Sequence, residues 1–152
     1  MIHILKIKVL SILILFSGCS TQTNNEAEYF VSDKSKELNF PFSDASIVGN
    51  IIYVSGQVGS EPGTREIVEG GIAAETLQTL NNINMILNDL GSNSDKIFKC
   101  LCMLEDINDY TEMNKAYTMF FNSRDSLPSR STFAGSGLAL GAKIEIECWA
   151  TK

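Results

Sequence analysis

Arg130 and Glu145 are the residues whose types and surroundings are best suited to chemistry on a small anion. Arg130 follows Pro128 and Ser129, and the proline restricts the backbone where a new strand begins. Its guanidinium presents two parallel N–H donors that match a carboxylate. Glu145 lies in the alternating run Lys143 to Glu147, and its carboxylate could accept a proton from an attacking water. Without further evidence, a surface ion pair at Arg130 and a solvated strand face at Glu145 are the more common explanations.

The N-terminal segment has the three parts of a secretory signal. Residues 1–18 contain two lysines followed by a short apolar run, and the segment ends in Ser17 and Gly18 before Cys19. Small residues before a cysteine resemble the bacterial lipobox, in which that cysteine is lipidated. We therefore expect a signal peptide over residues 1–18, a lipid on Cys19, and a protein that is exported and lipid-anchored in the bacterial cell envelope. A cleaved soluble export signal and an uncleaved apolar anchor are the alternatives.

Histidine is absent from the chain that this cleavage would leave, because His3 is the single histidine of the sequence. Ser-His-Asp catalysis, Cys-His catalysis and histidine-based zinc sites are then excluded. The loss of Lys6 and Lys8 would change the formal charge from −6 to −8, so a basic surface for nucleic acid is not expected. Chemistry must rely on carboxylates, arginine, hydroxyls, thiols or backbone groups.

Three further cysteines, Cys100, Cys102 and Cys148, lie in apolar, strand-like runs. Cys100 and Cys102 are two residues apart, so in a strand they point to one face and cannot readily bond each other. Either of them could form a disulfide with Cys148 if their strands are neighbours. A three-thiolate metal site is a weaker alternative, because the CxxC spacing of such sites is missing. Buried, unreactive thiols are the default expectation.

The chain after Cys19 divides into a polar segment and one folded domain. Residues 19–39 lack sustained periodicity, so we expect a polar tether there and a folded domain over 40–152. Gly49 and Asn50, between two β-prone runs, predict a hairpin. Hydrophobic periodicity then predicts two amphipathic helices and three more strands. The expected strands are 45–48, 51–55, 97–104, 130–135 and 142–151, and the expected helices are 72–90, ending at Gly91, and one with a D-x-x-E start at Asp109.

This order of elements favours an α+β fold in which a mixed sheet carries both helices on one face. In the last expected strand Ile144, Ile146 and Cys148 alternate with Glu145 and Glu147, so one face of that strand packs and the other does not. The uncovered face of the sheet must meet either water or another subunit.

Six short motifs occur in order between about residues 40 and 151. They are Pro41-Phe42-Ser43-x-Ala45, Val54-Ser55-Gly56-Gln57, the helix from Thr76 to Leu87, Met113-Asn114-Lys115-Ala116-Tyr117 with Phe120-Phe121, Pro128-Ser129-Arg130-Ser131-Thr132, and Lys143-Ile144-Glu145-Ile146-Glu147. Each motif alone is weak, but together and at this spacing they resemble the RidA family, also called the YjgF/YER057c/UK114 family.

The resemblance implies a chorismate-mutase-like α+β subunit in a homotrimer, with small-molecule sites between subunits and no metal or organic cofactor. Active family members hydrolyse reactive 2-imino and enamino acids, such as 2-aminoacrylate, to 2-oxo acids and ammonia. By resemblance, Arg130 would hold the substrate carboxylate and Glu145 would orient the attacking water. The substrate-binding residues that the resemblance implies are Phe42, Ser55, Gly56, Asn114, Ser131 and Thr132.

Two features depart from the family pattern. Phe42 stands where many active relatives carry tyrosine, so the ring is kept and a hydroxyl is lost. The export signal is the second departure, because the familiar imines arise in the cytosol. The alternative function is a trimeric binding module that holds a small carboxylate or a protein partner without turnover. We expect a small-molecule carboxylate, further copies of the chain and a membrane as partners, and no nucleic acid.

Overall fold

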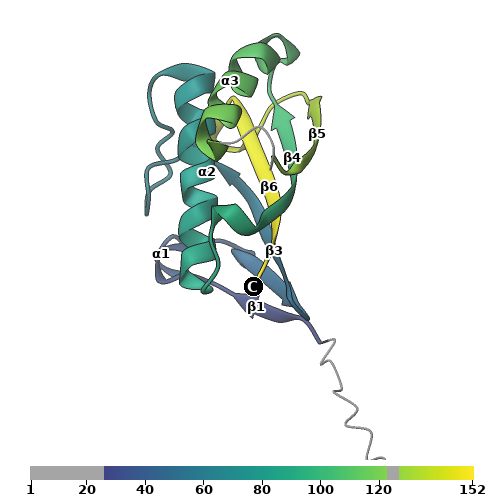
Figure 1. Ribbon diagram of the computed structural model, residues 1–152. Coiled ribbons are helices and arrows are strands. Elements are labelled where there is room, and N and C mark those ends of the chain that lie inside the picture. The colour runs from purple at the N-terminus through teal and green to yellow at the C-terminus, as the bar shows by residue number, and fades with distance from the viewer. Residues whose placement is uncertain (1–25, 123–126) are drawn as a thin grey trace, which may run out of the picture.

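The computed structural model describes residues 26–122 and 127–152, so the expected signal peptide and Cys19 lie outside the described residues (Figure 1). The strands are β1 (Glu28–Phe30), β2 (Ala45–Val48), β3 (Ile51–Val58), β4 (Ile97–Leu104), β5 (Ser129–Ala134) and β6 (Ile144–Thr151). The α-helices are α1 (Asp33–Glu37), α2 (Gly71–Asp89) and α3 (Tyr110–Phe121), and short 3₁₀ turns cover Ser94–Lys96, Ile107–Asp109 and Ala139–Gly141. Among these helices, none combines the length and apolar character that crossing a bilayer requires.

The strands form one sheet in the order β1-β2-β3-β6-β4-β5. All neighbouring strands are antiparallel except β4 and β5, which run parallel because α3 connects them. Helices α2 and α3 lie together on one side of the sheet, as Figure 1 shows. The prediction of an α+β fold with a mixed sheet and both long helices on one face is therefore confirmed.

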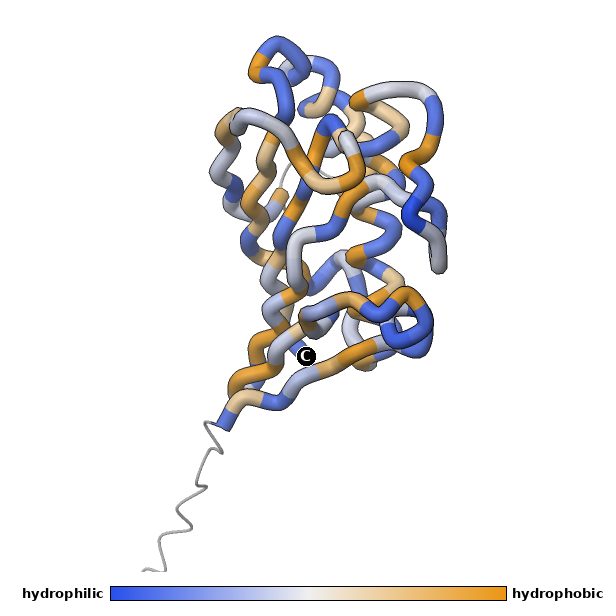
Figure 2. The backbone as a smooth tube through the Cα atoms, turned by 180° about the vertical axis from the view of Figure 1, so that it is seen from behind, coloured by the Kyte–Doolittle hydropathy of each residue, from blue (hydrophilic) through white to orange (hydrophobic). Residues whose placement is uncertain are grey.

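The hydrophobic core lies between the sheet and the helices. In β6 the side chains of Ile144, Ile146, Cys148 and Ala150 are fully buried, whereas the residues between them are only half-buried. Helix α2 contributes its apolar stripe to this core, and Met113 of α3 completes it. Figure 2 shows how hydrophobic residues, in orange, and hydrophilic residues, in blue, follow one another at short intervals along the chain. Within the described residues, no helix lies over the opposite face of the sheet, which we call the open face.

The ends of the two long helices follow from local sequence. Gly91 adopts a left-handed conformation just after α2, and its N–H donates to the carbonyl of Asn88, so the glycine terminates the helix as predicted. Asn122, also left-handed, ends α3. The start of α3 differs from the prediction, because the Asp109 side chain caps nothing. Asp106 instead accepts from the N–H of Asn108 and begins the preceding 3₁₀ turn.

The fold begins earlier than the predicted tether allowed, because residues 28–37 form β1 and α1. Strand β1 pairs with β2, and the carboxylate of Asp44 holds α1 in place. It accepts hydrogen bonds from the Ser35 hydroxyl at 2.6 Å and from the Ser32 N–H at 2.7 Å. Asp44 is buried and lies far from these serines in sequence. Periodicity cannot reveal such a contact, so this part of the tether prediction was wrong.

The cysteines also differ from the default expectation. Cys100 of β4 stands directly opposite Cys148 of β6, and the two form a disulfide, while Cys102 is free and buried. The expectation of three unreactive thiols was wrong because β4 and β6 are neighbours in the register that brings these two side chains together. Within the described residues, no group of three or more metal-binding side chains is clustered.

The disulfide is expected to contribute strongly to stability. Replacing both Cys100 and Cys148 by serine should lower the free energy of unfolding by about 4 kcal/mol, because the bond closes a long loop in the unfolded chain. The two cysteines are 48 residues apart in sequence. Urea denaturation of the double variant and of Cys102→Ala, which keeps the bond, measures the effect. Equal midpoints for the two variants would contradict it.

Candidate active site

Arg130 of β5 lies in a set of polar contacts with helix α3. Its strand partner is Cys100, whose side chain is buried on the helix side of the sheet, so Arg130 also points toward the helices. The guanidinium donates to the hydroxyl of Tyr110 at 3.3 Å, to the side-chain oxygen of Asn114, and to the sulfur of Met113 at 3.7 Å. Helix α3 therefore fixes the position of the predicted carboxylate-binding group.

Two aromatic rings flank the same guanidinium. The Arg130 Cζ lies 4.7 Å from the centroid of the Tyr117 ring and 5.7 Å from that of Tyr110. Rings at these distances attract a cation and restrict its plane. Tyr110, Asn114 and Tyr117 follow one another at spacings of four and three, so they share one face of α3. That spacing was the available signal for the two tyrosines, which the sequence analysis did not place in the site.

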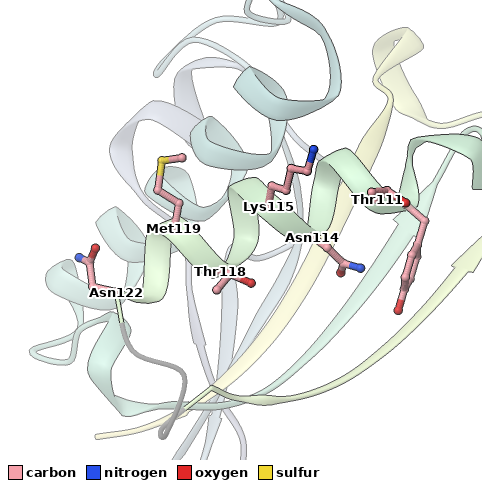
Figure 3. Close-up of a pocket in the computed structure, with 7 residues that line it drawn as sticks. Thr111, Asn114, Lys115, Thr118, Met119 and Asn122 are labelled. Carbon is pink, nitrogen blue, oxygen red and sulfur yellow. The ribbon is translucent and has the colours of Figure 1, made fainter.

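A hollow of about 320 Å³ opens beside Arg130. Its walls come from the start of β5 and from α3, and they are Tyr110, Asn114, Tyr117, Thr118, Leu127, Pro128, Arg130 and Thr132. Three of these residues also border a wider hollow of about 720 Å³ along α3. Figure 3 shows that second hollow, with Asn114 reaching toward the strands and Lys115 and Met119 pointing away from them. A small ligand therefore has room next to the guanidinium.

Two buried hydroxyls in the walls of the smaller hollow lack partners. Within the described part of the chain, neither the Tyr117 hydroxyl nor the Thr132 hydroxyl has a hydrogen-bond partner. Thr132 stands opposite Cys102 in the strand register, on the same side of the sheet as Arg130. Unpaired buried polar atoms are costly, so these two hydroxyls can serve a bound ligand or water.

Glu145 lies on the other face of the sheet, above a bulge in β3. Ser55 and Gly56 together stand opposite Glu147 alone, since Val54 pairs with Cys148 and Gln57 with Ile146. The Glu145 carboxylate rests directly on Gly56. A methyl group added at Gly56 would overlap the Oε1 atom of Glu145 and lie 2.9 Å from its Cδ. Gly56 therefore forms part of the bulge, and its lack of a side chain allows the Glu145 carboxylate to approach the backbone.

Three further predicted site residues, Phe42, Ser55 and Ser131, lie outside the Arg130 cluster. The Ser55 hydroxyl donates to the carbonyl of Ser43 at 2.6 Å, which ties the bulge to the loop before β2. Phe42 lies in that loop, exposed and stacked on Phe40 with ring centroids 5.3 Å apart. Ser131 points to the open face, where Lys99 donates to its hydroxyl at 3.2 Å. Within one chain, Phe42 and Ser131 are therefore not brought to Arg130.

Arg130 and Glu145 do not meet within a single chain. Arg130 shares the helix side with Cys100 and Cys148, whereas Glu145 is an odd number of residues from Cys148 along β6 and so points to the open face. The structure thus gives two half-sites. One consists of Arg130, Asn114, Thr132 and two tyrosines, and the other of Glu145 over the Ser55-Gly56 bulge.

Comparison with known proteins identifies the family. The family model described as "Endoribonuclease L-PSP" matches residues 34–152. The chain belongs to the endoribonuclease L-PSP family. Members of this family include proteins that carry the RidA and YjgF names, so the resemblance seen in the sequence motifs is confirmed.

Several relatives within the L-PSP family have names that state an activity. The chain is 38% identical over 112 residues to a bovine protein named "2-iminobutanoate/2-iminopropanoate deaminase". The matched residues make up 74% of this chain and 80% of the bovine protein. It is 33% identical over 137 residues to "Reactive Intermediate Deaminase A, chloroplastic" of Arabidopsis thaliana, covering 90% of this chain and 72% of that protein.

Solved structures of L-PSP family proteins share the fold. The YjgF gene product of E. coli superposes with a TM-score of 0.68 at 32% identity, over 74% of this chain and 88% of that chain. A yeast protein, YEO7, gives a TM-score of 0.75 at 30% identity, over 84% of this chain and 99% of that one. The six-stranded sheet with its helices is therefore the fold of the family.

Electrostatics differ between the two half-sites of this L-PSP family member. Around Arg130, burial raises the pKa of the Cys102 thiol to about 11, although the charge of Arg130 opposes this. The thiol therefore stays protonated at neutral pH. Hydrogen bonds from Asn114 and Arg130, and then the charge of Arg130, lower the pKa of the Tyr110 phenol. In the other half-site, burial and then the nearby Glu147 raise the pKa of Glu145.

Proposed function

We propose that this chain hydrolyses reactive 2-imino and enamino acids to 2-oxo acids and ammonia. The observation that carries the proposal is the guanidinium of Arg130, held by Asn114 and two aromatic rings beside a hollow of small-molecule size. The deaminase names of the bovine and Arabidopsis relatives support the same reaction. The family description also contains the word endoribonuclease, but a formal charge of −6 does not favour binding of nucleic acid.

The two half-sites have complementary roles in this reaction. Arg130 holds the substrate carboxylate through two N–H donors and so places the imine carbon. Glu145 accepts a proton from water as the water oxygen bonds to that carbon. The electron pair of the C=N double bond moves to nitrogen, which takes up this proton. The tetrahedral intermediate then collapses to the 2-oxo acid. The hydroxyl of the intermediate gives up its proton, the nitrogen gains one, and the C–N bond breaks so that ammonia leaves.

The bulge glycine is expected to be necessary for the position of Glu145. Replacing Gly56 by alanine should lower kcat/KM for 2-imino acid hydrolysis by on the order of a hundredfold, because the new methyl group displaces the carboxylate that orients water. Steady-state kinetics measures the loss, and Gly135→Ala is the matched control, since an added Cβ at Gly135 meets no atom within 4 Å. Unchanged kcat/KM in Gly56→Ala would contradict this role.

The pKa of Glu145 sets the acid limb of the pH profile. Glu145 works as a carboxylate, so activity should fall as the pH drops through its pKa, and the raised pKa places this limb above that of an ordinary glutamate. Replacing Glu147 by glutamine removes a like charge, so the limb should move to lower pH. The dependence of kcat/KM on pH measures the shift, with Glu37→Gln as the control. A limb that stays in place would exclude Glu147 as a cause.

A homotrimer would unite the two half-sites, with Arg130 and Glu145 supplied by neighbouring protomers. The resemblance to the RidA family implies this assembly, and the position of the two side chains on opposite faces of the sheet supports it. The open face also exposes apolar surface suited to burial, since Phe98 is 42% and Phe133 49% exposed. Light scattering on the purified protein should give three times the mass of one chain, and a monomeric mass would reject the assembly.

Export and lipid anchoring at Cys19 complete the proposal. The N-terminal sequence supports it, and so does the Cys100–Cys148 disulfide, because such bonds persist in oxidising compartments outside the cytosol. When the full chain is expressed in a bacterium, it should fractionate with membranes, and Cys19→Ser should release it. A chain that remains in the cytosolic fraction would refute the anchor.

The direct test of the proposed reaction is the release of 2-oxo acid and ammonia from a freshly generated 2-imino acid. The purified protein should accelerate both products in equal amounts above the spontaneous rate. Binding of a small carboxylate without any acceleration would instead identify the non-catalytic binding module.

A further inference from the structure

Tyr110 presents a polar group to the Arg130 hollow that no comparison or motif assigns to the site. It is the first residue of α3, it borders both hollows, and it is 39% exposed although its ring packs beside Arg130. We propose that Tyr110 is a further substrate-binding residue, whose phenol hydroxyl donates a hydrogen bond to the carboxylate that Arg130 holds. This inference rests on the proposed function, because it assumes a substrate with a carboxylate.

The hydrogen bonds around the phenol leave its proton available. A tyrosine hydroxyl has one proton to donate and an oxygen that can accept. The Tyr110 oxygen accepts from the Nη2 atom of Arg130 at 3.3 Å. Among the described residues, this hydroxyl accepts a hydrogen bond and donates none, so its proton can point away from the guanidinium, toward the hollow.

A carboxylate bound at this place needs more donors than the arginine alone supplies. Its two oxygens can accept about four hydrogen bonds, and a guanidinium fork provides two of them. The Nη2 atom of Arg130 gives its two N–H groups to the Tyr110 hydroxyl and to Asn114, so a carboxylate oxygen that replaces the phenol oxygen as acceptor on Nη2 would lie beside the phenol. The phenol then becomes the third donor to the same anion. Its lowered pKa, caused by Asn114 and Arg130, makes it a stronger donor.

The hydroxyl is not required to hold the arginine in place. The guanidinium also donates to Asn114 and to the sulfur of Met113, and the buried ring of Tyr117 lies closer to its Cζ than the ring of Tyr110 does. Removal of the Tyr110 hydroxyl alone therefore leaves the position of Arg130 determined by three other contacts. A loss of affinity in Tyr110→Phe then reports a missing contact with the ligand.

The test compares Tyr110→Phe with the wild-type protein and with Tyr29→Phe, a matched control at a tyrosine that is 72% exposed in β1. Pyruvate is the probe, because it carries the carboxylate and the 2-oxo group of the proposed products. Calorimetry should show that Tyr110→Phe raises the Kd for pyruvate about tenfold, the loss of one hydrogen bond to a charged group, while Tyr29→Phe leaves it unchanged. A change below twofold in Tyr110→Phe would overturn the inference.

A crystal structure of the wild-type protein with pyruvate gives an independent readout. The Tyr110 oxygen should lie within hydrogen-bond distance of a pyruvate carboxylate oxygen, and a pyruvate bound away from it would overturn the inference even if affinity changes. The two proposals also fail separately. Imine hydrolysis with an unchanged Kd in Tyr110→Phe rejects only the role of Tyr110. Tight pyruvate binding that depends on Tyr110, without any imine hydrolysis, rejects only the proposed reaction.

Discussion

Replacing Arg130 by alanine is expected to lower kcat/KM for 2-imino acid hydrolysis by on the order of a thousandfold, because two charge-assisted hydrogen bonds to the substrate carboxylate are lost together. KM should rise as well, since the same bonds hold the ground state. Arg130→Lys keeps the charge but not the planar pair of donors, so its activity should lie between those of the alanine variant and the wild type.

Controls for Arg130→Ala must separate a loss of substrate binding from a loss of folding. Arg130 packs between the rings of Tyr110 and Tyr117, so circular dichroism and thermal unfolding should accompany the kinetics. Lys96→Ala removes an exposed cation that is not among the residues lining the hollow and should leave kcat/KM unchanged. If Arg130→Ala folds normally and retains activity within a few-fold, the guanidinium does not hold the substrate.

Glu145→Gln is expected to lower kcat by on the order of a thousandfold while substrate binding stays nearly intact, because the amide cannot accept a proton from water.

A more specific result should come from mixing. Arg130→Ala and Glu145→Gln subunits, expressed together, should form mixed trimers in which about a third of the sites combine an intact Arg130 with an intact Glu145. The purified mixed trimers should therefore recover about a third of wild-type activity, although each variant alone is inactive.

Purification with two different affinity tags ensures that only mixed assemblies are measured. The matched controls are trimers of each single variant, assembled from differently tagged copies of that variant and purified in the same way. If the mixed preparation is no more active than the single variants, then Arg130 and Glu145 do not act across a boundary between protomers. Their opposite orientations in one chain would then argue against a shared reaction.

The sequence predicts most of this fold because its elements have strong local signals. The Gly49-Asn50 turn, the stripe of α2 and the alternation in β6 each depend on residues close together in the chain, and all three agree with the structure. Strand β1 and helix α1 have no such signal, because Asp44 and the pairing with β2 stabilise them from a distance. The sequence alone therefore could not distinguish this segment from a tether.

The candidate site was predictable only in part, for a similar reason. The six motifs point to Arg130, Asn114, Thr132, Glu145 and Gly56 as site residues, but their separation into two half-sites depends on strand parity and order. The Cys100–Cys148 disulfide needs the same knowledge of which strands are neighbours. Tyr110 was missed because a tyrosine at a helix start is an ordinary surface residue until Arg130 is seen beside it.

The early start of the fold at Glu28 would also govern how the protein sits at a bilayer. With a lipid on Cys19, residues 19–27 alone would join the anchor to β1, and nine residues span at most about 30 Å even when fully extended. In a trimer, three tethers of this length are related by a threefold axis. All three can reach the same flat bilayer when this axis is perpendicular to it. An anchored trimer of this kind would hold its three sites at the same distance from the bilayer.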